Sequence, residues 1–164
     1  MMQQQLVKVG MADLNIASGG AVLKTTGLGS CVGLALFDEQ NHIAGLAHVM
    51  LPTSGIARDS TFNIAKYADT AIPDLIGKMV EAGANQKKMI AKMAGGAQMF
   101  AFSAQSDAMR IGPRNVESCK QILSLYEIPV FGEDTGGSYG RTVEFDSLSG
   151  VLVIRSVQFG VKEI

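Results

Sequence analysis

The order of the predicted elements favours an α+β fold. Short apolar runs typical of strands occupy the first third of the 164-residue chain, helical spacing prevails in the middle, and strand-like runs return in the last third. This grouping of strands and helices argues against the regular alternation of a βαβ nucleotide-binding fold. The length suits one domain, and no repeat or long linker divides the chain, so residues 1–164 are expected to form a single domain.

The first third contains three predicted strands. They cover residues 21–25, 30–37 and 42–50. The polar segment 38–41 separates the last two and has the composition of a turn. We therefore expect residues 30–50 to form a β-hairpin.

Two helices are predicted in the middle of the chain. Apolar residues between positions 62 and 80 recur mainly at intervals of three and four, and Gly83 follows as a helix-terminating glycine. Pro73 either opens this helix in its first turn or kinks a longer one. The second helix is expected to begin near Pro113, and one of its faces carries the side chains of Val116, Cys119, Leu123 and Tyr126.

The remaining predicted strands lie on either side of the second helix. They cover residues 89–94, 128–131, 141–145 and 151–157. Residues 146–150 have a turn composition, so the last two strands are expected to form a hairpin.

Composition excludes several classes of protein. Fourteen Lys and Arg residues against fifteen Asp and Glu residues give a net charge of −1, with no basic run, so no nucleic-acid partner is expected. Apolar runs such as 151–154 fall far short of the ~18 residues that cross a bilayer, so no membrane insertion is expected. The first twenty residues lack the apolar core of a secretion signal, and two cysteines are too few for a disulfide scaffold. A cytoplasmic location is therefore expected.

The sequence shows neither the histidines of a zinc site nor a complete glycine-rich phosphate-binding motif. His42 and His48 are the only histidines, which excludes a three-histidine zinc site. The glycine-rich segments 95–97 and 135–140 complete neither phosphate-binding pattern, so turns and close backbone contacts are favoured for both. Arg141 and the pair 114–115 could bind a substrate carboxylate, but structural salt bridges or loop hydrogen bonds are favoured. We expect no metal and no cofactor.

Cys31 and His48 form the best nucleophile–base pair that the sequence offers. If the hairpin turn is centred between Glu39 and Gln40, Cys31 lies directly opposite His48. Opposed residues on antiparallel strands point to the same face, with Cβ atoms roughly 4.5–5.5 Å apart, so the thiol and the imidazole could meet. A turn of odd length would place them on opposite faces.

The residues before Cys31 add to this hypothesis. A glycine-containing bend ends at Gly29 and Ser30, where backbone N–H groups could hold an oxyanion. An adjacent imidazolium would lower the pKa of the thiol below that of a free cysteine. Thr25 is a candidate for fixing the histidine tautomer. The alternative is structural: Cys31 as a small buried hydrophobe, His48 as a core histidine, and the bend as a tight corner. The residues alone leave both interpretations open.

Seven elements of the sequence resemble the chemoreceptor glutamine deamidase family, CheD, and they span nearly the whole chain in family order. They are residues 25–32 (TTGLGSCV), 47–52 (AHVMLP), 66–71 (KYADTA), 92–100 (KMAGGAQMF), 111–115 (IGPRN), 133–137 (EDTGG) and Arg141. The resemblance implies a sandwich of mixed and antiparallel strands flanked by two main helices. The family's nucleophile, base and histidine-orienting threonine correspond to Cys31, His48 and Thr25.

The resemblance also implies an activity and partners. It implies a cytoplasmic enzyme without a cofactor that converts glutamine side chains of methyl-accepting chemotaxis receptors to glutamate. Hydrolysis of glutamate methyl esters and binding of the phosphatase CheC are further expectations. The main alternative is an adaptor for the receptor or for CheC in which the Cys/His pair is idle, and an amidase for small substrates is a third hypothesis.

Overall fold

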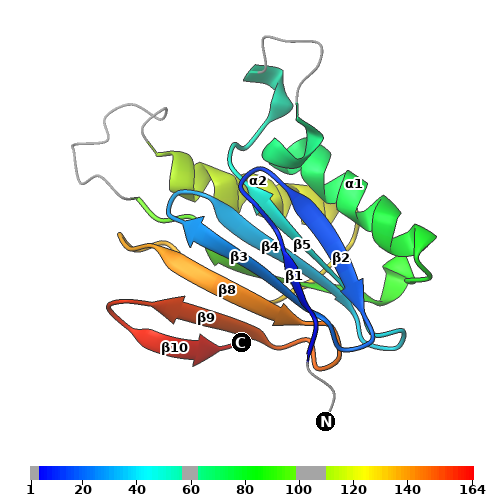
Figure 1. Cartoon of the computed structure of the whole chain (residues 1–164). Helices are drawn as coiled ribbons and strands as arrows, with labels where there is room; N and C mark the ends of the chain where they lie inside the picture. The colour runs from blue at the N-terminus through cyan, green and yellow to red at the C-terminus, as the bar shows by residue number, and fades with distance from the viewer. Residues whose placement is uncertain (1–3, 57–62, 99–109) are drawn as a thin grey trace.

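Two five-stranded β-sheets and two α-helices make up the regular structure of the described residues (Figure 1). The computed structural model describes residues 4–56, 63–98 and 110–164. The helices are α1 (Ala68–Glu81) and α2 (Ile111–Leu125). Three short 3-10 helices are η1 (Ser54–Ile56), η2 (Ile64–Lys66) and η3 (Gln86–Lys88).

The outer sheet joins strands from both ends of the chain. Its spatial order is β1 (Leu6–Lys8), β3 (Val22–Leu28), β8 (Arg141–Asp146), β9 (Leu152–Ser156) and β10 (Gly160–Glu163). The β1–β3 pair is parallel and the other pairs are antiparallel.

The inner sheet lies between the outer sheet and the helices. Its spatial order is β2 (Leu14–Ser18), β5 (Ile43–Val49), β4 (Val32–Asp38), β6 (Met89–Gly95) and β7 (Val130–Thr135). Only the β6–β7 pair of this sheet is parallel among the described strands. The expected α+β sandwich with two main helices is therefore confirmed.

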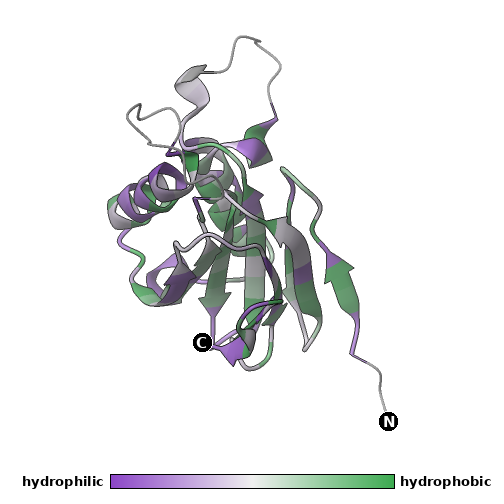
Figure 2. Cartoon of the chain, turned by 90° about the vertical axis from the view of Figure 1, so that its left-hand side faces the viewer, coloured by the Kyte–Doolittle hydropathy of each residue, from purple (hydrophilic) through white to green (hydrophobic). Residues whose placement is uncertain are grey.

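Two hydrophobic cores hold the three layers together. On one face of β4, Val32, Leu34 and Leu36 pack against α1 and α2. On its other face, Ala35 and Phe37 pack against the outer sheet. Because both faces of β4 are covered, all seven of its residues are buried, which explains its almost unbroken apolar sequence. Figure 2 shows hydrophobic colour along the strands in the middle of the molecule.

The sequence predicted both helices but missed three strands. β1, β2 and β10 were not predicted: β1 has only three residues, β2 buries only Ala17, and β10 is an exposed sheet edge without a buried face. Pro73 lies inside α1, five residues after its start, so of the two alternatives that the sequence left open, the position in the first turn is excluded. Residue 62 of the first predicted helix and residues 99–100 of one family segment lie outside the described residues.

The β4–β5 hairpin forms, but its register differs from the prediction by two residues. His48 pairs with Gly33, not with Cys31, and the last pair before the turn is Asp38–Ile43. Four residues therefore lie in the turn, and the Asp38 carboxylate accepts hydrogen bonds from the N–H and the side-chain amide of Asn41. Because the turn has an even number of residues, Cys31 and His48 point to the same face of the sheet, as the sequence predicted.

Neither helix in the described part of the chain combines the length and the apolar character that crossing a bilayer requires.

Candidate active site

A hydrogen bond between the two sheets orients His48. The Thr25 Oγ1 atom, on β3 of the outer sheet, lies 2.7 Å from Nδ1 of His48, on β5 of the inner sheet. Both residues are buried. Alternation along β5 turns His48 toward the outer sheet, together with Ala44 and Leu46. The expected pairing of Thr25 with the imidazole is thus present in the structure.

The other ring nitrogen of His48, Nε2, is buried and has no hydrogen-bond partner among the described residues. When Nδ1–H donates to the Thr25 hydroxyl oxygen, the lone pair lies on Nε2, where it can accept a proton. Burial lowers the pKa of His48, so the neutral ring prevails at neutral pH.

Cys31 lies on the same face of the inner sheet as His48. It immediately precedes β4 and packs between the sheets with Leu28 and Ala94. Gly33, two residues further, also faces the outer sheet and is the direct partner of His48. The prediction of a shared face is therefore correct, although the direct pairing is wrong.

The thiol is buried, with 9% of the residue exposed. Burial raises the pKa of Cys31, and the hydrogen bond from its own backbone N–H only partly offsets this. The expected lowering of this pKa by an imidazolium is wrong for the resting site, because His48 is neutral there. With a neutral thiol and a neutral imidazole, the base has to take the thiol proton as the sulfur attacks.

The two candidate oxyanion residues, Gly29 and Ser30, differ in whether their backbone N–H group already donates a hydrogen bond. The Gly29 N–H donates to the Gly27 carbonyl oxygen at 3.1 Å, so it is already engaged. The N–H groups of Ser30 and Cys31 donate to no other residue in the described part of the chain. They are therefore the candidate donors for a developing negative charge, although the Cys31 N–H also contacts its own sulfur.

The end of β6 and the two residues after it hold the Cys31 segment. The Gly96 N–H donates to the Cys31 carbonyl oxygen at 2.8 Å, and the Ala97 N–H donates to that of Gly29 at 2.9 Å. Gly95 has a φ of 106°, and a Cβ there would overlap the Cys31 carbonyl oxygen. The predicted close backbone contact of this segment is confirmed, and it requires glycine.

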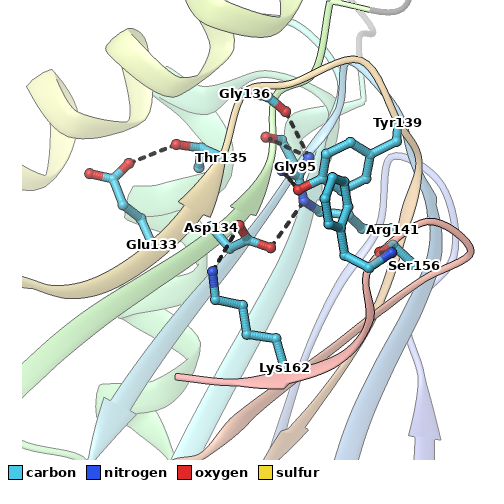
Figure 3. A network of polar contacts seen from close by, with 10 residues as sticks. Gly95, Glu133, Asp134, Thr135, Gly136, Tyr139, Arg141, Ser156 and Lys162 are labelled. Carbon is cyan, nitrogen blue, oxygen red and sulfur yellow. Dashed lines mark hydrogen bonds and ion pairs between the residues drawn. The ribbon is translucent and has the colours of Figure 1, made fainter.

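Arg141 anchors the same glycine segment (Figure 3). Its guanidinium is nearly inaccessible, with 3% of the residue exposed, and donates to the carbonyl oxygens of Gly95 at 3.4 Å and Gly136 at 3.0 Å. It also contacts Asp134 Oδ2 at 3.3 Å and donates to the Tyr139 hydroxyl at 3.0 Å. Arg141 therefore has the structural role that the sequence favoured, and each of its three guanidinium nitrogens already donates a hydrogen bond.

Two surface hollows adjoin the Cys31 bend. One, of about 580 Å³, runs along α2 and includes Gly96, which bonds to the Cys31 carbonyl. The other, of about 670 Å³, includes Gly27 and residues of β8 and β9. Cys31 and His48 are not among the described residues that line either hollow.

In residues 4–56, 63–98 and 110–164, no group of three or more His, Cys, Asp or Glu side chains is placed to hold a metal ion. Cys119 is on the buried face of α2 and is fully buried, which raises its pKa to about 12. It is therefore the unreactive cysteine of the two.

The fold and the site define an α+β sandwich with a thiol, an imidazole and a hydroxyl at one end of the space between its sheets, an arrangement typical of enzymes that use a cysteine nucleophile. Comparison with known proteins gives the family. Residues 50–156 match the family described as CheD chemotactic sensory transduction.

Relatives cover nearly the full chain. The protein named "Chemoreceptor glutamine deamidase CheD" of Halalkalibacterium halodurans is 52% identical over 159 residues, which are 97% of this chain and 98% of that protein. The Bacillus subtilis protein of the same name is 50% identical over 97% of this chain and 96% of its own length. A "Probable chemoreceptor glutamine deamidase CheD" of Caldanaerobacter subterraneus is 48% identical over 99% of this chain and 100% of its own length. The chain belongs to the CheD family, as the sequence motifs indicated.

Proposed function

We propose that this protein is a chemoreceptor glutamine deamidase that converts glutamine side chains of methyl-accepting chemotaxis receptors to glutamate. The names and near-complete coverage of its relatives support the activity and the substrate class. One structural observation carries the assignment to residues. The Thr25–His48 hydrogen bond leaves an unpartnered Nε2 on the sheet face that also carries Cys31.

The first half of the reaction is acyl transfer to sulfur. His48 Nε2 takes the thiol proton while Cys31 Sγ attacks the δ-carbonyl carbon of the receptor glutamine. The carbonyl π electrons move to the oxygen, and the N–H groups of Ser30 and Cys31 stabilise this oxyanion. The intermediate then collapses, the C–N bond breaks, and His48 returns its proton to the nitrogen, which leaves as ammonia.

The second half is hydrolysis of the thioester. His48 takes a proton from water, and the resulting hydroxide attacks the acyl carbon. The C–S bond breaks and the sulfur regains its proton, so the products are a glutamate side chain and the free thiol. A glutamate methyl ester has the same acyl carbon, so it is a second proposed substrate, with methanol as its leaving group.

The proposed setting follows from the family. The substrate glutamines belong to the cytoplasmic helical region of the receptors, so the enzyme is proposed to act in the cytoplasm. CheC is the proposed protein partner, and family membership is its support. Addition of CheC to the deamidation assay tests this: a change in rate that saturates with CheC concentration is expected, and an unchanged rate together with no co-elution would contradict binding.

The activity is tested by incubating the protein with a receptor cytoplasmic fragment and mapping amide-to-acid mass changes peptide by peptide. Wild-type protein is expected to convert specific glutamines, while Cys31→Ala and His48→Ala are expected to convert none. Cys119→Ala is the matched control, because it removes the other thiol and is expected to retain conversion. Retained deamidation by Cys31→Ala would exclude this nucleophile.

Thiol labelling separates the enzyme from an idle adaptor. With iodoacetamide, Cys31 is expected to react faster than Cys119, and His48→Ala is expected to slow Cys31. An adaptor would convert no receptor glutamine, and the labelling rate of Cys31 would not depend on His48. Cleavage of free amides with unmodified receptor fragments would instead indicate an amidase for small substrates.

A further inference from the structure

The ladder that joins the Cys31 strand to the His48 strand ends just short of the thiol. The last pair at this end is Val32–Val49, so Cys31 and Met50 lie beyond it. After β5 the chain turns away, because the N–H groups of Met50 and Leu51 donate to the Lys66 carbonyl oxygen. The ladder itself therefore does not fix the separation of the two segments at the level of the thiol.

Asn115, on α2, bridges this gap. Its Nδ2 donates to the Ser30 carbonyl oxygen at 2.9 Å and to the Met50 carbonyl oxygen at 3.0 Å. One acceptor immediately precedes Cys31, and the other lies two residues after His48. Because both partners are carbonyl oxygens, the amide must present its nitrogen to them, which fixes its orientation.

The packing of α2 brings Asn115 to this position. Gly112 lies so close to Ala97 that a Cβ on it would overlap the Ala97 carbonyl oxygen. A Cβ on Gly96 would likewise overlap the Val116 side chain. Two glycines, one on each side of the contact, thus allow the first turns of α2 to reach the Cys31 bend.

The second polar atom of Asn115 indicates that the side chain acts through its donors. Oδ1 is buried and has no partner among the described residues, which is destabilising in itself. An apolar residue would avoid this cost but would lose both hydrogen bonds to the Ser30 and Met50 carbonyl oxygens.

We propose that Asn115 is a positioning residue of the active site, which holds the Cys31 segment and the His48 strand at the separation that proton transfer requires. The inference rests on the proposed function for the roles of Cys31 and His48. Asn115 itself touches neither substrate nor the reacting sulfur in this role. It acts through the two carbonyl groups that flank the pair.

The test is a double-mutant cycle on the alkylation of Cys31 by iodoacetamide, followed by peptide mass mapping. The proteins are wild type, Asn115→Ala, His48→Ala and the double variant, all well below their melting temperatures. In the wild-type background His48→Ala is expected to slow alkylation about tenfold, and in the Asn115→Ala background by less than about twofold. The pH profile of Asn115→Ala is expected to approach that of His48→Ala.

Ser118→Ala is the matched control. Ser118 lies one turn further along α2, is buried, and donates to the Pro52 carbonyl oxygen at 2.7 Å, beyond the site. Its removal is expected to lower the melting temperature while leaving the effect of His48→Ala intact. If Asn115→Ala fails to fold, Asn115→Ser takes its place: it keeps a donor for only one carbonyl and is expected to reduce the coupling in part.

Each outcome decides the proposal. Equal effects of His48→Ala in the wild-type and Asn115 backgrounds would overturn it, as would an equal loss of coupling in Ser118→Ala. No effect of His48→Ala in wild type would overturn both this inference and the role of His48. Loss of coupling in Asn115→Ala without receptor deamidation by wild type would instead support the positioning role and refute the proposed substrate.

Discussion

Replacing Thr25 by valine isolates the hydrogen bond that orients the proposed base. Valine keeps the shape of the buried side chain but removes the hydroxyl that lies 2.7 Å from His48 Nδ1. During proton transfer the ring becomes an imidazolium, so the lost contact is a hydrogen bond to a charged group, worth about 1.5–3 kcal/mol. At about 1.4 kcal/mol per tenfold in rate, kcat is expected to fall about 10- to 150-fold.

The assay is the rate of glutamine conversion in a receptor fragment, measured over a range of fragment concentrations. Because Thr25 acts on the ring and not on the substrate, KM is expected to stay unchanged. Thr25→Ser keeps a hydroxyl and is expected to retain most of the activity. Thr26→Val is the control on the same strand, since Thr26 is exposed. A Thr25→Val enzyme with kcat within about twofold of wild type would refute the reasoning.

Two further predictions concern stability. Gly95→Ala is expected to lower the free energy of unfolding, measured in urea, by about 2 kcal/mol more than Gly136→Ala does. Both glycines have a positive φ, but only a Cβ on Gly95 would overlap the Cys31 carbonyl oxygen. Equal losses of stability in the two variants would contradict the importance of this contact. Burial alone would raise the pKa of Asp38, but hydrogen bonds from Asn41 and Asn85 hold it below its usual value. Its stabilising effect is therefore complete above about pH 4 and is lost as the pH falls further. The melting temperature is expected to drop there, less steeply in Asp38→Asn, and equal slopes would exclude this role.

The sequence predicted the fold class and the shared face of Cys31 and His48, because both depend on local patterns. The register failed by two residues, since the Asp38 loop holds four residues through side-chain hydrogen bonds that no hydropathy pattern records. The direction of the Cys31 pKa was also wrong, because burial depends on the outer sheet that closes over the thiol.

Contacts between distant segments could not be predicted from spacing. Thr25 is 23 residues from His48; its pairing with the imidazole was expected from its position before the bend and from the family resemblance, but spacing alone did not indicate that it lies on the facing sheet. Asn115 is 85 residues from Ser30 and 65 from Met50, and the sequence favoured only structural salt bridges or loop hydrogen bonds for residues 114–115 over binding of a substrate carboxylate.

Because the hydroxyl and the imidazole belong to different layers, the orienting hydrogen bond exists only after the sandwich has closed. A nascent chain that has folded its inner sheet alone would carry the thiol without a directed base. Such an intermediate would not react with the amides of other proteins. Catalytic competence would thus require both sheets to be in place.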